Sequence, residues 1–531
     1  MVNSAAHKEV NQVVTFGTML ALMVGTLVCA GSRPAAEKEF QNPILFADYS
    51  DPDVIRDGNN YYLVASTFHF VPGIPILHSN DLVHWTILGH IVSRLDLNEK
   101  YSLVGGNKYG EGIWAPAIRR HSGRFYVYFP TPKEGIFVST ATKITGPWSK
   151  PVAVIAKPGL EDPCPFWDDD GSAYLVHGKV GAGPLILHRM APDGLSVLDE
   201  GRELVNDAKE LPTLEGPKFY KRHGYYYIFA PFGGVATGSQ AVLRSKSIYG
   251  PYDHRVVLAK GTTKINGPHQ GGYVETQSGQ GWFIHFQQRG AHGRIVHLEP
   301  VRWEDDWPVI GKADPGVTTG EPVAEGSIPD HKGHDSAKRP QTSDEFNGRT
   351  LGPQWEWNHN PDDDHWTLSR RPGFLRLEPT PAEDLFHARN TLTQMMQDDA
   401  FELTARFDLT HLKAGDHTGL AMFEKNASGL EIVQEDGKRG LRFWQAAKSS
   451  GGDTAIALVA QSVQLRVRVH GDTANYFYSI DEGKEFQPLG PPAMLTFSWW
   501  KGSRPAVFAF TKESGSNGFV DIDWVRYQKL D

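Results

Sequence analysis

The sequence of 531 residues contains only two cysteines, Cys29 and Cys164. A framework of several disulfides is therefore excluded, and the stability of the fold has to come from packing. Lys and Arg number 53 against 62 Asp and Glu, which gives a net charge of −9. Because the chain has no excess of basic residues to neutralise phosphates, we expect no nucleic-acid partner.

Long apolar runs are scarce, and one of them lies near the N-terminus, at residues 13–30. Lys8 precedes the run, which ends in a Val-Cys-Ala triplet typical of a signal-peptidase site. We interpret residues 1–30 as a signal peptide and expect a secreted or periplasmic protein without a transmembrane segment after its removal. A single membrane anchor is the alternative, because the run approaches the length that spans a bilayer.

Amphipathic helical patterns are also scarce, whereas 55 Gly, 35 Pro and 11 % aromatic residues are typical of short strands joined by tight turns. Five aromatic, strand-like segments each follow a turn and recur at intervals of about fifty residues. These segments are 61–64, 125–129, 173–178, 225–230 and 282–286. The period indicates a β-propeller of five blades. A β-sandwich with coincidental turn spacing is the alternative.

Residues 313–341 are poor in large apolar side chains and rich in Pro, Gly and Ser, which predicts a linker. Beyond it, 401–409 and 463–470 alternate apolar and polar residues, as strands do when one face packs on a core. We therefore expect an all-β protein, with a five-bladed β-propeller at 40–312 followed by a β-sandwich of concanavalin or lectin-like type at 342–531.

Acidic residues beside Pro or Gly mark three candidate positions for acid/base chemistry, Asp51, Asp162 and Glu215. At such turns a strand ends and a side chain can point into a cleft. Spacing alone does not choose between Asp51 and Asp53, which share a face of an extended segment, nor between Asp162 and Glu161. Tyr, Phe and Trp follow each position, and flat apolar rings of this kind line sugar sites.

Four motifs resemble glycoside hydrolase family 43, and the resemblance covers roughly residues 40–530. They are SDPDVIR at 50–56, STFHFVPG at 66–73, GIWAP at 112–116 and EGPKFY at 215–220. That family contains β-xylosidases and α-L-arabinofuranosidases on five-bladed propellers, with a C-terminal β-sandwich in its two-domain members. The resemblance implies an inverting, exo-acting hydrolase that releases terminal β-D-xylose or α-L-arabinofuranose from hemicellulose oligosaccharides and needs no cofactor for catalysis.

The resemblance also implies the catalytic roles: general base for Asp51, pKa-modulating aspartate for Asp162 and general acid for Glu215. An inverting glycosidase needs an ionised carboxylate to activate water and a protonated carboxyl for the leaving oxygen, about 6.5–9.5 Å apart. A negative charge on Asp162 would keep the general acid protonated. The family pattern places the base and the pKa-modulating aspartate directly before proline, and so selects Asp51 over Asp53 and Asp162 over Glu161.

Five further residues match family positions around the sugar. Phe68, Phe70 and Trp114 would pack on the terminal sugar, Arg294 would reach its hydroxyls, and His269 would lie near the propeller axis, where it could hold water or a cation. The structural alternatives are a place in the blade core for Trp114 and a surface ion pair for Arg294.

In the second domain, Asp344 and Asp523 resemble positions that hold a structural Ca²⁺ in related sandwiches, with solvated turn acids as the alternative. The polar loop 357–364 resembles a family loop that reaches the propeller, and we expect it to close one end of the pocket.

Two other functions stay open. A non-catalytic carbohydrate-binding propeller would keep the aromatic residues without needing the three acids. A retaining fructan or sucrose hydrolase of a related five-bladed fold would hold its carboxyls about 5–5.5 Å apart; the absence of an Asn-Asp-Pro-Asn-Gly segment disfavours it.

Overall fold

The computed structural model describes residues 39–329, 338–446 and 455–531. These ranges contain strands and short 3₁₀ helices but no α-helix, and none of their helices is long and apolar enough to cross a membrane. The 3₁₀ helices are η1 (Glu99–Ser102), η2 (Gly290–His292) and η3 (Asp363–His365). The predicted signal peptide at 1–30 lies outside the described residues.

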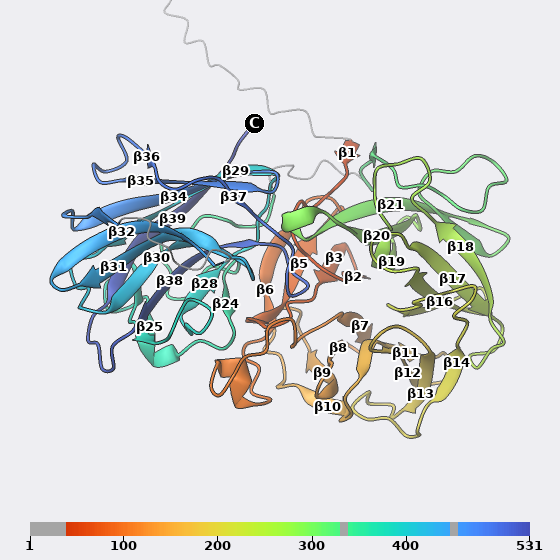
Figure 1. The fold of residues 1–531 in the computed structure, drawn as a ribbon. Coiled ribbons are helices and arrows are strands. Elements are labelled where there is room, and N and C mark those ends of the chain that lie inside the picture. Colours follow the sequence, from red (N-terminus) through yellow and green to blue (C-terminus); the bar gives the residue numbers. More distant parts are fainter. Residues whose placement is uncertain (1–38, 330–337, 447–454) are drawn as a thin grey trace, which may run out of the picture. The chain divides into compact units, whose positions relative to one another are not determined.

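Five four-stranded antiparallel sheets form the blades of a propeller (Figure 1), which confirms the predicted fold of the first domain. Blade 1 contains β2 (Asp53–Asp57), β3 (Asn60–Val64), β5 (Gly73–Ser79) and β6 (Thr86–Val92). Blade 2 contains β7 (Ala117–His121), β8 (Arg124–Thr131), β9 (Gly135–Ala141) and β10 (Val152–Ile155). Blade 3 contains β11 (Leu160–Trp167), β12 (Ala173–Lys179), β13 (Leu185–Met190) and β14 (Arg202–Val205). Blade 4 contains β15 (Lys218–Arg222), β16 (Tyr225–Phe232), β17 (Ser239–Ser245) and β18 (Asp253–Leu258). Blade 5 contains β19 (His269–Glu275), β20 (Gly281–Gln288), β21 (Arg294–Glu304) and β22 (Trp307–Ile310).

The first strand of each blade is an edge strand that contacts the first strand of a neighbouring blade, in the order β19, β2, β7, β11 and β15. Tight turns start the second strands. Ser122 and Gly123 between β7 and β8, and His223 and Gly224 between β15 and β16, all have positive φ of 46 to 77°. Two successive residues of this kind form the type I′ turn that matches the twist of a hairpin. These turn residues thus fix where the first strand of a blade ends and its second strand begins.

The segment before blade 1 and the predicted linker both pack on the propeller. Leu45 pairs with Val296 of blade 5, and the side chain of Asn42 donates to the backbone oxygens of Leu298 and Val323. Strand β1 (Glu39–Gln41) pairs with β23 (Glu325–Ser327), which lies within the predicted linker. The described part of that linker is therefore fixed to the propeller by backbone pairing.

The second domain is a sandwich of two antiparallel-rich sheets, as predicted. One sheet contains β33 (Ile456–Ala457), β32 (Lys438–Gln445), β31 (Ser428–Glu435), β30 (Asp416–Phe423), β38 (Arg504–Thr511), β28 (Thr391–Thr393), β24 (Glu356–Asn358) and β4 (Phe70–Val71), with β27 (Thr380–Pro381) beside β38. The other contains β25 (Trp366–Thr367), β26 (Leu375–Leu377), β39 (Val520–Lys529), β29 (Ala400–Asp408), β34 (Ser462–His470), β35 (Thr473–Ser479) and β36 (Gln487–Pro488), with β37 (Ala493–Met494) beside β35. The alternating apolar residues of β29 and β34 are buried between the sheets.

A strand of the propeller segment joins a sheet of the sandwich. β4 pairs with β24, so that Val71 faces Trp357 and Phe70 faces Asn358. One buried apolar cluster also includes residues of both domains, among them Val71, Ile113 and Trp357. Separating the two domains would expose this cluster and leave a strand edge unpaired. The sandwich therefore shares a sheet and an apolar core with the propeller segment.

A buried ion pair makes a second connection between the domains. The ammonium of Lys501 lies 2.8 Å from the backbone oxygen of Asp48 and 3.3 Å from its carboxylate. The same carboxylate accepts the backbone N–H of Gly502 at 2.8 Å and that of Arg294 at 2.9 Å. Asp48 precedes Asp51 by three residues, so the sandwich supports the turn that carries the predicted general base.

Candidate active site

The three predicted acids surround one cavity of about 420 Å³ at the beginnings of the first strands of blades 1, 3 and 4. Asp51 lies just before β2, Asp162 lies near the start of β11, and Glu215 lies just before β15. The cavity is lined by these acids together with Phe68, Trp114, Ala115, Glu161, Val180, Gly181, Ala182, Thr213, Gly234, Val235, His269, Gln270, Arg294 and Trp500. All five blades and the sandwich thus contribute to one site.

Asp51 is held in a left-handed conformation, with φ of 53°, and both of its carboxylate oxygens have donors. Oδ1 lies 2.8 Å from the guanidinium of Arg294, and Oδ2 accepts the hydroxyl of Ser66 at 2.6 Å. A general base acts as an ionised carboxylate, and the guanidinium of Arg294 supplies the counter-charge for it. The positive φ of Asp51, just before β2 begins, directs its side chain into the cavity.

Asp53, the competitor of Asp51 in the sequence, lies outside the cavity. Its carboxylate is fully buried and is bound by the guanidinium of Arg119 at 2.7 Å and the N–H of Ile118 at 2.9 Å. This pair links the first strands of blades 1 and 2. The geometry therefore gives Asp53 a structural role and leaves Asp51 as the acid that faces a ligand.

Asp162 accepts two hydrogen bonds in a protein-enclosed position. Its Oδ2 accepts the backbone N–H of Gly216 at 2.7 Å and the side-chain amide of Gln270 at 3.0 Å. Burial, followed by the nearby carboxyl of Glu215, raises the pKa of Asp162 to about 7.

Glu215 is the most exposed of the three acids, with 21 % of its side chain accessible against 7 % for Asp51. Its Oε1 lies 2.5 Å from Nε2 of His269, and its backbone N–H donates to the oxygen of Pro231. The following Gly216 has φ of 56°, and a Cβ there would collide with Gln270. This sharp turn exposes the Glu215 carboxyl to the cavity, where it can reach a leaving group.

Phe68, Trp114 and Arg294 line the cavity as predicted. The ring centroids of Phe68 and Trp114 are 6.1 Å apart, and the indole N–H of Trp114 donates to the oxygen of Gly110. Arg294 is buried against the face of Phe286 as well as paired with Asp51. The alternative of a surface ion pair for Arg294 is therefore wrong. His269, also a predicted site residue, is buried, and its Nε2 is hydrogen-bonded to the carboxyl of Glu215.

The prediction that Phe70 packs on the sugar is wrong. Phe70 lies in β4, is 2 % exposed and packs against the guanidinium of Arg504, which is 3.8 Å from the ring centroid. In a regular strand Phe68 and Phe70 would share a face. Phe68 has φ of 54°, however, so the chain turns between them. Phe68 consequently faces the cavity, and Phe70 faces the contact with the sandwich.

The loop 357–364 reaches the propeller but does not line the cavity. The backbone N–H of His359 donates to the oxygen of His69, and that of Asn360 donates to the oxygen of Tyr101. The sandwich reaches the cavity instead through Trp500, which is 48 % exposed and lies 6.1 Å from the ring of Trp114. The prediction located the contact in the wrong loop.

The carboxylates of Asp344 and Asp523 do not fit a calcium site. The oxygens of Asp344 accept the N–H groups of Phe346 and Gly352 and the indole N–H of Trp355. Asp523 is paired with Arg406 at 2.5 Å. Hydrogen-bond donors thus take the positions that a cation would need, and neither acid belongs to a cluster of three metal-ligating groups in the described ranges.

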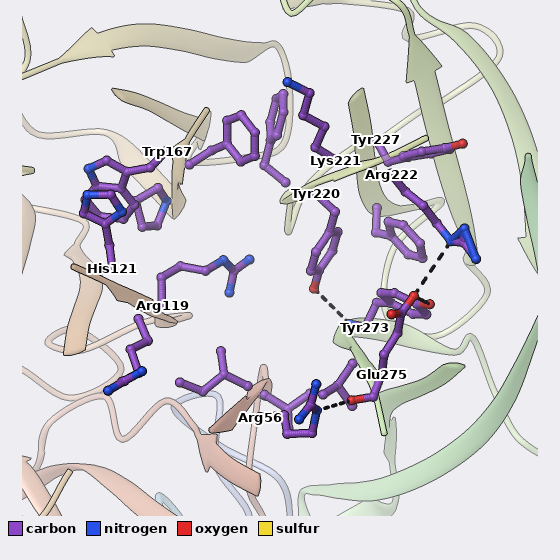
Figure 2. Close-up of a pocket in the computed structure, with 18 of the residues that line it drawn as sticks. Arg56, Arg119, His121, Trp167, Tyr220, Lys221, Arg222, Tyr227, Tyr273 and Glu275 are labelled. Carbon is purple, nitrogen blue, oxygen red and sulfur yellow. Dashed lines mark hydrogen bonds and ion pairs between the residues drawn. The ribbon is translucent and has the colours of Figure 1, made fainter. Parts of the chain in front are cut away.

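A second, larger cavity of about 720 Å³ lies at the other ends of the same first strands (Figure 2). The side chains of Arg56, Trp167, Arg222 and Glu275 stand near the ends of β2, β11, β15 and β19. The guanidinium of Arg222 lies 3.7 Å from the carboxylate of Glu275, and Arg56 donates to the backbone oxygen of Glu275 (Figure 2). The two acids that line this cavity, Asp169 and Glu275, are paired with Lys221 and Arg222. We therefore place the candidate catalytic site in the smaller cavity.

The comparisons with known proteins agree with this geometry. The sequence model of glycosyl hydrolases family 43 matches residues 40–308, and that of the beta xylosidase C-terminal concanavalin A-like domain matches residues 343–528. A putative beta-xylosidase of Xylanibacter ruminicola is 43 % identical over 86 % of this chain and 84 % of its own length. The non-reducing end alpha-L-arabinofuranosidase BoGH43B of Bacteroides ovatus is 29 % identical over 97 % of this chain and 99 % of its own length.

Among solved structures, the bifunctional GH43-CE of Bacteroides eggerthii superposes with a TM-score of 0.84 at 29 % identity. That match covers 93 % of this chain and 64 % of the other chain. Both domains of the described fold are included in these matches. All the residues that line the candidate cavity except Trp500 lie within the first of them. The chain belongs to glycosyl hydrolases family 43.

Proposed function

We propose that the protein is an inverting, exo-acting glycoside hydrolase that releases terminal β-D-xylose or α-L-arabinofuranose from hemicellulose oligosaccharides. The observation that carries the proposal is the convergence of the Arg294-bound Asp51 and the more exposed Glu215 on one cavity. A xylosidase and an arabinofuranosidase among the relatives support both sugars. The cavity volume of about 420 Å³ suits a small ligand, which supports action on chain ends.

In the proposed reaction, water attacks the anomeric carbon of the terminal sugar while Asp51 takes a proton from it. The glycosidic bond breaks, and Glu215 donates its proton to the leaving oxygen. Asp51 is then protonated and Glu215 ionised, so that solvent returns the proton before the next turnover. The two carboxyls act from different blades, and no cofactor enters the reaction.

Asp162 supports the general acid through its charge. Two N–H donors, from Gly216 and Gln270, favour the ionised form of Asp162, and its negative charge then opposes the loss of the proton from Glu215. Burial and the like charge raise the pKa of Asp162 itself to about 7, so this support weakens at lower pH. The arrangement suits turnover at neutral pH or above.

The function is tested with paired 4-nitrophenyl glycosides of β-D-xylose and α-L-arabinofuranose. We expect the full-length protein to release at least one sugar, and Asp51→Asn to abolish release from both. Asp253→Asn, on exposed β18, is the matched control and should retain full activity. Glu215→Gln should lose far more activity on natural oligosaccharides than on aryl glycosides, whose leaving group needs no proton. Failure of the unaltered protein on both glycosides and on xylan and arabinan fragments would refute the proposal.

We further propose that the protein acts outside the cytoplasm, as a secreted or periplasmic enzyme without a nucleic-acid partner. Residues 1–30 support export, and the net charge of −9 disfavours nucleic acid. Sequencing the N-terminus of the protein from culture medium or periplasm tests the first point: a start beyond residue 30 is expected, and an intact N-terminus in a membrane fraction would refute cleavage.

A further inference from the structure

A fourth carboxyl group, that of Glu161, faces the catalytic cavity and has no part in the reaction above. Glu161 is 4 % exposed and contributes to the wall of the cavity. One of its oxygens lies within 4.8 Å of oxygens of Asp162 and Glu215. Burying an additional acid beside two others is unfavourable unless the group has hydrogen-bond partners.

A local irregularity of β11 directs both Glu161 and Asp162 into the cavity. Successive residues of a regular strand point to opposite faces of the sheet. Here the register between β11 and β12 shifts between Glu161 and Cys164, and Asp162 has φ of 55°. Bulges of this kind redirect side chains beside active sites. The two neighbouring acids therefore share a cavity that a regular strand would give to only one of them.

Only one of the two carboxyl oxygens of Glu161 has a hydrogen-bond partner in the described part of the chain. Its Oε1 accepts the backbone N–H of Ala182 at 3.2 Å. The stem crosses Gly178 of β12, where a Cβ would lie 3.4 Å from Cγ of Glu161. This is the one hydrogen bond of Glu161 within 39–329, 338–446 and 455–531, so the second oxygen has no partner in that part of the chain. Ala182 and Glu161 both line the cavity, so the carboxyl of Glu161 lies at the cavity wall.

The charge state of Glu161 makes it a donor. Burial, followed by the carboxyls of Asp162 and Glu215, raises the pKa of Glu161 to about 9. At neutral pH the group is then a neutral carboxylic acid with an O–H. Glu161 has no fully buried oxygen that lacks a partner in the described ranges, so its second oxygen is open to the cavity that the residue lines. A sugar hydroxyl in the cavity would supply the missing acceptor.

We propose that Glu161 is a substrate-binding residue whose carboxyl O–H donates a hydrogen bond to a hydroxyl of the terminal sugar. The inference rests on the proposed function, because the ligand is the pentose that the enzyme releases. It assigns the four cavity acids to different tasks: one activates water, one donates a proton, one supplies a negative charge, and Glu161 positions the sugar.

The first test compares two substitutions of Glu161 in the full-length protein. Glu161→Gln keeps a donor and an acceptor for the N–H of Ala182, and we expect kcat/KM on the aryl pentoside to stay within about threefold. Glu161→Ala removes the donor, and we expect a fall of about 10- to 100-fold. Glu203→Ala, on the exposed strand β14 of the same blade, is the control and should have no effect. Thermal midpoints of all variants show whether folding is retained.

The second test identifies the hydroxyl with aryl pentosides that each lack one ring hydroxyl. In the unaltered protein, removal of the hydroxyl that Glu161 binds should lower kcat/KM, whereas in Glu161→Ala the same deoxy substrate should lose little further. A residue with a merely structural role would give the same relative loss in both proteins. Because the test compares the ratio of kcat/KM values for two substrates within one protein, it stays informative for a variant whose folding is weakened.

Two results would overturn the inference. An equal fall of kcat/KM in Glu161→Gln and Glu161→Ala would mean that the residue acts as an ionised carboxylate. If every deoxy substrate lowered kcat/KM by the same factor in the unaltered protein and in Glu161→Ala, the residue would not contact the sugar. Both results leave the proposed function intact, since they require an active unaltered protein. Inactivity of the unaltered protein on both pentosides would instead refute the proposed function.

Discussion

Replacing Lys501 by Met tests whether the sandwich stabilises the turn of the catalytic base. The ammonium of Lys501 is buried against Asp48, at 3.3 Å from its carboxylate, and also lies 3.2 Å from the backbone oxygen of Ser66. Burial lowers the pKa of Lys501, while the charge of Asp48 opposes that change. For Asp48, burial acts to raise the pKa, but Lys501 and the N–H groups of Gly502 and Arg294 hold it below its usual value. The two charges therefore depend on each other.

The expected loss of unfolding free energy in Lys501→Met depends on the hydrogen bonds that the Asp48 carboxylate keeps. Breaking a buried ion pair costs about 3–5 kcal/mol, because one charge remains uncompensated. The N–H groups of Gly502 and Arg294 and the hydroxyl of Ser50 still bind the carboxylate. We therefore expect a loss near the lower limit, about 3 kcal/mol. Met has a similar length, so little of this loss should come from packing.

The assay is urea unfolding followed by tryptophan fluorescence, combined with kcat on the aryl pentoside. Lys512→Met, at an exposed position, is the matched control. The double variant with Asp48→Asn should be more stable than the sum of the two single losses predicts, by about 1 kcal/mol or more. We also expect kcat to fall in Lys501→Met, since Asp48 binds the backbone of Arg294, the partner of the base. An unchanged unfolding midpoint, or strictly additive losses, would refute the reasoning.

Four further outcomes are expected. Proton NMR of early product from a β-xyloside should show the α-anomer first, and early β-xylose would indicate retention. In Asp162→Asn the general acid should lose its proton more easily, so the alkaline limb of the pH–kcat profile should move to lower pH; a uniform loss of rate without that movement would argue for a substrate contact. Trp500→Ala should raise KM on small aryl glycosides about 10-fold or more with retained thermal stability, because the ring stands at the cavity; an unchanged KM would exclude Trp500 from the site. Burial acts to raise the pKa of Glu356, but Arg504 and His90 lower it to about 2, so the ionised carboxylate stabilises the fold above about pH 4.5 and this stabilisation is lost as the pH falls towards 2. In Glu356→Gln the free energy of unfolding should therefore decrease by about 3 kcal/mol less over this pH range than in the unaltered protein. An unaltered slope of stability against pH would count against the ion pair.

The blade number and the three acids could be predicted from the sequence because both depend on local signals. Each blade repeats a turn followed by an aromatic strand, and a turn such as Ser122–Gly123 forms from its own residues. Asp51, Asp162 and Glu215 stand at turns next to Pro or Gly, and the family motifs choose among neighbouring acids. Left-handed φ values at Asp51 and Asp162 then direct both side chains into the cavity.

The errors come from contacts between distant parts of the chain. The direction of Phe70 depends on the positive φ of Phe68 and on the pairing of β4 with β24 of the sandwich, neither of which has a local signal. Trp500 reaches the cavity from a loop far along the sequence. A pair of adjacent Trp residues could have drawn attention to it, because two successive large rings cannot both enter one face of a core. The sequence presents Glu161 only as a competitor of Asp162, because the bulge that directs both side chains into the cavity is visible only in the structure.

The connection between Lys501 and Asp48 also has a consequence for biosynthesis. The two residues are 453 positions apart in the chain. A ribosome that adds about 5–20 residues per second needs roughly 20–90 s to make the intervening segment. Until the segment is complete, the chain contains Asp48 but not the cation that pairs with it, and for the first part of that time it also lacks β24, which pairs with β4. A chain that has not yet acquired its C-terminal strands therefore exposes a strand edge, which favours aggregation, and a chaperone that binds it until those strands emerge should increase the yield of active enzyme.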